Sequence, residues 1–172
     1  MKKLISVILV TFFFSQSFAQ KKESYQIHAM MIYNFMNYLE FDLPNPNSDF
    51  VIGVLSDDDT YKTMLNWYDG KTYRGSHTID VKRIKTAEDM SGFYNLIFVT
   101  PDSKTEHPAV VKKLEGTTTL LLSAGKELSG KGSVINFIVE GGRLNFEISK
   151  KQAEAHKIKI SSSLLAMGKQ ID

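Results

Sequence analysis

Residues 50–67, FVIGVLSDDDTYKTMLNW, decide the fold. The run 50–55 is apolar at every position except Gly53, which is the pattern of a strand covered on both faces. It enters the acidic turn 56–59, and Met64, Leu65 and Trp67 then follow at the spacing of a short helix. Strand, acidic turn and helix in this order form the first half of a βαβ unit.

Similar units continue along the chain. Residues 77–84 alternate as a second strand, and 95–100 form another buried apolar run. A helix is expected over 108–114 with Pro108 in its first turn, followed by a Thr- and Leu-rich strand over 117–122. Strands that alternate with short helices predict an α/β fold with a mostly parallel sheet flanked by helices.

The last third of the chain predicts a C-terminal antiparallel hairpin. Two strands, 133–139 and 144–148, are joined through Gly141 and Gly142, and a Gly-Gly pair favours a type I′ turn. Ser149 with Gln152 forms a capping box for a helix that is expected to stop near His156. Residues 157–160 alternate like a strand, and 161–163 provide a cap for a final apolar segment, 164–167.

Upstream of the first strand, residues 25–39 contain no Gly or Pro and carry a broad apolar stripe at helical spacing. The breadth predicts a helix covered on more than one side. Tyr and Met are favoured at protein interfaces, so an exposed remainder of Met30, Tyr33 and Met36 would form a docking face or a dimer seam. His28, within this helix, is expected to be a core histidine.

The first residues have the features of a secretory signal. Lys2 and Lys3 precede the apolar stretch 4–14, and 17–19 offer small residues where a signal peptidase cleaves. The stretch is shorter than the about 20 residues that span a bilayer, which disfavours the alternative of an uncleaved anchor. We therefore expect residues 1–19 to be a cleaved signal peptide and 20–172 to form a single α/β domain in the periplasm. The chain has no Cys, so a lipid anchor at the cleavage site is not expected.

Composition excludes several functions. Without Cys the chain forms no disulfide, no Cys-ligated metal site and no cysteine nucleophile. The formal charge of +2 comes from 21 basic and 19 acidic residues, and removal of Lys2 and Lys3 leaves a neutral mature chain. Neither net charge is basic enough to indicate a surface that binds nucleic acid, so no nucleic-acid partner is expected.

No catalytic, metal or cofactor site is predicted. Residues 125–131 have the Gly and Lys spacing of a phosphate-binding loop, but Gly132 replaces the required Ser or Thr and a strand follows instead of a helix. The four His residues lack metal-ligand spacing, and no G-x-S-x-G elbow occurs. The triplet 57–59 would hold a cation only if consecutive side chains converged, so we favour a helix cap by Asp58 or Asp59, with the others solvated.

Three segments in order resemble the YfiR family of exported regulators of cyclic-di-GMP signalling. They are IYNFMNYLEF at 32–41, IGVLSDD at 52–58, and GSVINF at 132–137 followed by GRLNFEI at 142–148 and IKISSSLL at 158–165. The resemblance covers 24–167. Ser149 stands where the family often has Asn, which is an equally good cap. Redox control by disulfides, thought to operate in some members, does not transfer to a chain without Cys.

The resemblance implies a non-catalytic periplasmic protein that binds the extracytoplasmic part of a membrane-bound diguanylate cyclase or sensor kinase, with an outer-membrane protein as a further partner. The matched motifs suggest Tyr33, Asn34 and Arg143 as contact residues. The alternative is a small-ligand-binding sensor with a pocket at the carboxyl edge of the sheet, near Ser56, Asp57 and Asp58. A periplasmic hydrolase lacks an assembled nucleophile and base.

Overall fold

The computed structural model describes residues 24–41, 43 and 48–172. The predicted signal peptide lies outside these residues. Within them, no helix combines the length and the apolar character that crossing a membrane requires.

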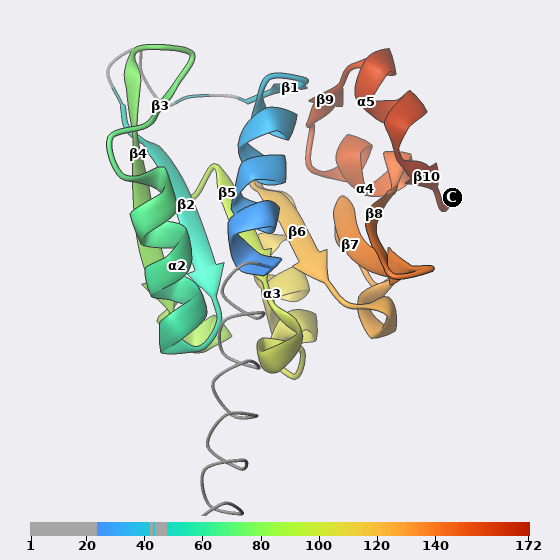
Figure 1. Ribbon diagram of the computed structural model, residues 1–172, viewed down its shortest axis with the longest axis horizontal. Coiled ribbons are helices and arrows are strands. Elements are labelled where there is room, and N and C mark those ends of the chain that lie inside the picture. Colours follow the sequence, from blue (N-terminus) through green and yellow to red (C-terminus); the bar gives the residue numbers. More distant parts are fainter. Residues whose placement is uncertain (1–23, 42, 44–47) are drawn as a thin grey trace, which may run out of the picture.

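An eight-stranded sheet runs through the molecule in the order β10-β8-β7-β6-β5-β2-β4-β3 (Figure 1). Its strands are β2 (Phe50–Leu55), β3 (Thr72–Tyr73), β4 (His77–Ile84), β5 (Leu96–Val99), β6 (Leu120–Ala124), β7 (Ile135–Glu140), β8 (Arg143–Ile148) and β10 (Lys169–Gln170). A separate two-stranded sheet pairs β1 (Leu39–Glu40) with β9 (Lys159–Ile160).

Five neighbouring strands are mutually parallel, in the order β4, β2, β5, β6 and β7, which confirms the predicted mostly parallel sheet. The chain passes from β2 to its neighbour β4, then returns to the other side of β2 for β5 and continues outward through β6 and β7. This is a doubly wound order, in which the direction of winding reverses between β2 and β5.

β7 and β8 form the predicted antiparallel hairpin, with Glu140 paired to Arg143. Gly141 has a φ of 58° and Gly142 a φ of 75°, as a type I′ turn requires at both central positions. The strand predicted over 117–122 begins later than expected, because Thr117 to Thr119 lie in a loop and β6 begins at Leu120.

Helices cover both faces of the sheet (Figure 1). The helix over residues 24–36 and α2 (Asp58–Tyr68) lie on one face, and α3 (His107–Leu114) lies on the other. Two short helices, α4 (Lys150–Ala155) and α5 (Ser162–Met167), follow the hairpin. Short 3-10 helices η1 (Ala87–Asp89), η2 (Pro101–Ser103) and η3 (Lys126–Leu128) occupy the connections.

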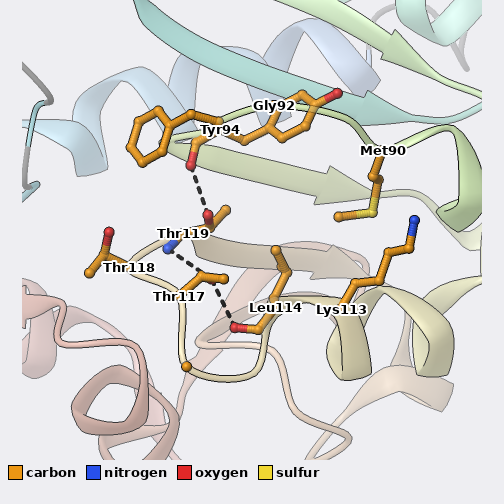
Figure 2. Close-up of a pocket in the computed structure, with 10 residues that line it drawn as sticks. Met90, Gly92, Tyr94, Lys113, Leu114, Thr117, Thr118 and Thr119 are labelled. Atoms are coloured by element: carbon orange, nitrogen blue, oxygen red, sulfur yellow. Dashed lines mark hydrogen bonds between the residues drawn. The ribbon is translucent and has the colours of Figure 1, made fainter.

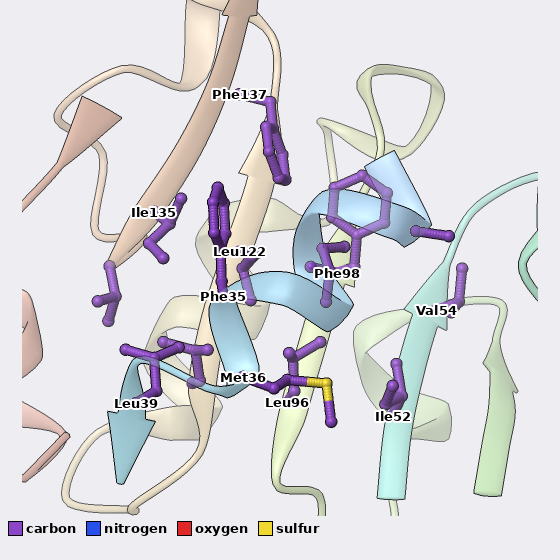
Figure 3. Packing of buried hydrophobic residues seen from close by; sticks show 14 of the residues in the cluster. Phe35, Met36, Leu39, Ile52, Val54, Leu96, Phe98, Leu122, Ile135 and Phe137 are labelled. Atoms are coloured by element: carbon purple, nitrogen blue, oxygen red, sulfur yellow. The ribbon is translucent and has the colours of Figure 1, made fainter. Parts of the chain in front are cut away.

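The larger core lies between the helix 24–36 and the sheet (Figure 3). Phe35 stacks on Phe137 with ring centroids 5.8 Å apart and contacts Phe146 at 4.6 Å. Tyr68 of α2 donates a hydrogen bond to the carbonyl of Ala29, which ties the two helices together. A smaller core on the opposite face packs Val110 and Leu114 of α3 against the sheet.

The first helix differs from its prediction at its end and on its outer face. It ends at Met36, because the chain turns at 37–38 and Leu39 pairs with Ile160 in the small sheet. Met36 is fully buried and therefore belongs to the core, so its place on an exposed docking face was wrong. Ile27 and Met30 are 40% and 45% exposed, so the outer face of this helix is open, whereas the sheet and α2 cover its other sides.

Gly53 provides a test of how tightly β2 packs against the smaller core. A Cβ at this position would lie 2.6 Å from Ile84 Cδ1 and 2.9 Å from Tyr94 Cδ1. We expect Gly53→Ala to lower the free energy of unfolding by about 1–3 kcal/mol, as measured by urea denaturation, since overpacking forces core side chains to move. Ile84→Val removes the nearest atom, so the double variant should lose less stability than the two single losses added together. Simple additivity would contradict this account.

Candidate functional site

The predicted residues after β2 have structural partners. Ser56 is buried and its hydroxyl donates to the Asp57 carbonyl at 3.0 Å. Asp57 is the N-cap of α2, because its Oδ1 accepts a hydrogen bond from the Thr60 amide at 2.8 Å. The expected cap by Asp58 or Asp59 was therefore wrong. Asp58 instead forms an ion pair with Arg83.

At the point where the winding reverses, the residue after β5 is hydrogen-bonded to the end of β2. Thr100, which follows β5, is fully buried. Both its amide and its hydroxyl donate to the Leu55 carbonyl, at 3.1 and 3.3 Å. Ligands commonly bind at such a switch point, and here the Leu55 carbonyl and the Thr100 hydroxyl are already hydrogen-bonded to each other.

Tyr33 is fixed at the opposite edge of the sheet. Its hydroxyl donates to the Thr72 carbonyl at 3.0 Å, and its ring meets Trp67 edge-on at 5.7 Å. Thr72 pairs with Thr78 at the amino end of β4, whereas Ser56 follows the carboxyl end of β2. A strand of six residues separates these ends by roughly 20 Å.

Arg143 lies at the same edge as Ser56 but on another strand. It opens β8, which is four strands away from β2 in the sheet, a lateral separation of roughly 19 Å. Arg143 is exposed, as is Asn34 on the first helix. The structure thus separates the six predicted residues into three places.

A pocket of about 330 Å³ does lie at the carboxyl edge, beside β5, β6 and β7. None of Ser56, Asp57 and Asp58 is among its lining residues, and a pocket beside those three residues stays a prediction. Its lining residues are Ser24, Tyr25, His28, Pro101, Ala124, Gly125, Lys126, Phe137, Val139 and Leu144. We call this the carboxyl-edge pocket.

His28 forms part of this pocket as a core residue. It is 6% exposed, and its Nδ1 lies 2.8 Å from the Ser24 carbonyl, which fits a hydrogen bond donated by the ring. Its ring meets Phe137 edge-on at 4.9 Å. Burial lowers the pKa of His28, against a smaller opposing effect of the hydrogen bond to Ser24, so the ring is neutral at neutral pH. Lys126 then contributes the positive charge of this largely apolar pocket.

Sequence reasoning missed a row of buried polar side chains across three strands. The Ser123 hydroxyl donates to Asn136 Oδ1 at 2.8 Å, and Asn136 Nδ2 donates to Glu147 Oε2 at 3.3 Å. Lys169 Nζ lies 3.7 Å from the other Glu147 oxygen. The signal was available, because a hairpin centred on Gly141 and Gly142 places Asn136 opposite Glu147.

Two kinds of candidate site can be checked directly in the described residues. Within 24–41, 43 and 48–172, no group of three or more His, Asp and Glu side chains is placed to hold a metal ion. The loop 125–131 contains η3 and continues toward β7, so no helix N-terminus faces it as in a phosphate-binding loop.

A family model described as YfiR/HmsC-like matches residues 25–169. No curated protein matches the chain significantly.

Two solved structures share the fold. One is a Streptococcus pneumoniae ABC domain in complex with L-Trp, with a TM-score of 0.59 and 15% identity, aligned over 81% of this chain and 59% of its own. The other is a conserved domain protein from Vibrio cholerae O1 biovar El Tor, with a TM-score of 0.57 and 13% identity, over 86% and 60%. The chain spans about three fifths of the length of each neighbour.

The adjacent carboxylates Asp57 and Asp58 are expected to differ in their effect on stability. Asp57→Ala removes the α2 cap and should lower the free energy of unfolding by about 0.5–2 kcal/mol, whereas Asp57→Asn should retain most of the stability. Asp58→Ala breaks an ion pair whose carboxylate side chain is 59% exposed, so a loss below about 1 kcal/mol is expected. Thermal or urea denaturation of the three variants measures this. Equal losses for Asp57→Ala and Asp58→Ala would refute the assignment of the cap.

Proposed function

Because the chain belongs to the YfiR/HmsC-like family, we propose that the mature protein is a non-catalytic periplasmic regulator that binds the extracytoplasmic part of a membrane signalling protein. The single observation that carries this proposal is the extent of the family match, which runs from Tyr25 to Lys169 and includes the sheet and the helices on both of its faces. The family is regulatory and acts in cyclic-di-GMP signalling. A membrane-bound diguanylate cyclase or a sensor kinase is therefore the proposed partner class, with an outer-membrane protein as a second partner.

The tip of the β7–β8 hairpin is the proposed contact surface. Val139 is 66% exposed, which is unusual for an apolar residue in a strand, and the exposed Arg143 begins the next strand. Val139 pairs with Leu144 and Arg143 with Glu140, so the two side chains lie on opposite faces of the tip. An exposed Arg is typical of the residues that dominate protein interfaces, and an exposed apolar side chain adds surface that a partner would bury. Asn34, exposed on the first helix, is retained as a second candidate contact. Tyr33 is reassigned as a positioning residue, because its hydroxyl and ring already contact the protein itself.

A pull-down from membranes of the source organism tests this proposal. Mature protein, residues 20–172, crosslinked gently, should recover a cyclase or sensor kinase of the inner membrane. Val139→Asp and Arg143→Ala should each lower recovery several-fold, because the first would bury a charge in the contact and the second removes an interface anchor, which costs more than about 1 kcal/mol. Lys62→Ala, which removes an exposed cation on α2, should leave recovery unchanged.

Deletion of the gene supplies an independent measurement. The resemblance to repressors of diguanylate cyclases leads us to expect a rise in cellular cyclic-di-GMP. An unchanged level, together with no membrane partner after crosslinking, would overturn the proposal.

The carboxyl-edge pocket favours a second candidate function, a small-ligand sensor. Its volume of about 330 Å³ lies within the range of ligand sites, and its lining is mainly apolar with one ammonium group. One of the two structural neighbours was solved with L-Trp, which supports testing amino acids first. Sensing and partner binding are compatible, since a ligand would shift whichever conformation the partner recognises.

Thermal denaturation with amino acids and other small metabolites tests the sensor function. A ligand at 100 times its dissociation constant should add about 2.7 kcal/mol of stability to the mature protein. Ala124→Phe, which places a ring in the pocket, should abolish this gain, provided that circular dichroism shows a folded variant. A gain that survives Ala124→Phe would place the ligand elsewhere, and no gain with any compound would count against a sensor.

A further inference from the structure

A second pocket lies at the amino-terminal edge of the sheet, opposite the carboxyl-edge pocket (Figure 2). It has a volume of about 470 Å³ and is bounded by the segment that leads into β5 and by the loop between α3 and β6. Figure 2 shows Met90 and Lys113 at one side, Thr118 at the other, and Leu114 between them. We call it the amino-edge pocket.

The walls of this pocket are held by internal hydrogen bonds. The Thr119 hydroxyl donates to the Tyr94 carbonyl at 2.8 Å, which joins the two walls directly. The Thr117 hydroxyl donates to the Leu114 carbonyl, also at 2.8 Å, and fixes the start of the loop at the end of α3. These bonds make the pocket pre-formed, so little conformational entropy would be lost when a ligand binds.

Its chemistry combines an apolar lining with one cation. Phe93 is 40% exposed although it is a large aromatic residue, and Met90 and Leu114 add further apolar surface. Lys113 donates from Nζ to the Glu88 carbonyl at 3.2 Å. Across the part of the chain that the structure describes, no carboxylate forms an ion pair with this ammonium group. An ammonium group bonded to a neutral carbonyl keeps its full positive charge and two further donors.

We propose that the amino-edge pocket binds a small amphipathic carboxylate. The apolar body of the ligand lies between Phe93, Met90 and Leu114, and its carboxylate accepts a hydrogen bond from Lys113. A cationic ligand is excluded by like charge, and a polyanion would leave its other charges against an apolar wall. The site uses none of the residues proposed to contact a membrane partner, so it is independent of that function.

Calorimetry or NMR titration of the mature protein with 4-phenylbutyrate tests the assignment. The neutral analogue 4-phenylbutyramide has nearly the same shape, and 4-phenylbutylamine carries the opposite charge. The acid should bind about two- to fivefold more tightly than the amide, because the amide carbonyl can still accept a hydrogen bond from the exposed Lys113 but lacks the opposite charge, and the amine should bind most weakly.

Three matched variants locate the binding site. Lys113→Gln should weaken binding of the acid about two- to fivefold and weaken binding of the amide less, so that the preference for the acid disappears. Lys112→Gln, which removes the neighbouring exposed cation of α3, and Lys126→Gln, in the carboxyl-edge pocket, should leave the affinity for the acid unchanged. Thr118→Trp should block both ligands by filling the pocket, with retention of fold verified by circular dichroism.

Several results would overturn the proposal. These are no binding of the acid, equal affinities of acid and amide, or an affinity for the acid that Lys113→Gln leaves intact. Loss of binding in Lys126→Gln alone would assign the acid to the carboxyl-edge pocket, which would also overturn the proposal.

Discussion

The burial of β2 on both faces is the constraint on which the rest of the structure depends. Ile52 and Val54 face the larger core, and Leu55 faces the smaller one, all fully buried. A strand of this kind is stable only when helices cover both sides of its sheet and other strands flank both of its edges. The helix 24–36 and α2 supply one cover, α3 supplies the other, and β4 and β5 occupy the edges. Gly53 shows how little space is left, because Ile84 and Tyr94 occupy the volume that a side chain would need.

The sequence predicted those elements whose conformation depends on neighbouring residues. The apolar run 50–55, the Gly-Gly turn and the Ser149 and Ser161 caps were each recognisable because neighbouring residues alone fix those conformations. Properties that depend on distant partners were less accessible. Leu39 left the first helix for a strand because of Ile160, more than a hundred residues away. Asp57, rather than the next two carboxylates, became the cap because the start of the helix decides which side chain reaches the Thr60 amide.

The difference between local and distant determinants also explains how much of the candidate site could be predicted. That a pocket lies at the carboxyl edge follows from the class of fold, but its position along that edge depends on strand order and on how the strand ends are filled. At the reversal point Thr100 donates twice to Leu55, and the carboxyl-edge pocket lies further along, beside β5, β6 and β7. A Thr after an apolar run carries no signal of this role. The amino-edge pocket was missed for a related reason, since Thr117 to Thr119 read as strand residues and not as the wall of a cavity.

The buried row of Ser123, Asn136 and Glu147 has a consequence for folding accuracy. Side chains alternate between the two faces of a sheet, so a slip of one residue between β7 and β8 would turn Glu147 toward Phe35 and the larger core. A carboxylate placed there without its Asn136 partner would cost several kcal/mol. The hydrogen-bonded row therefore adds to the penalty on misaligned pairings, which would also turn Phe146 and Ile148 out of the larger core. It protects the alignment on which the position of the exposed Val139 and Arg143 depends.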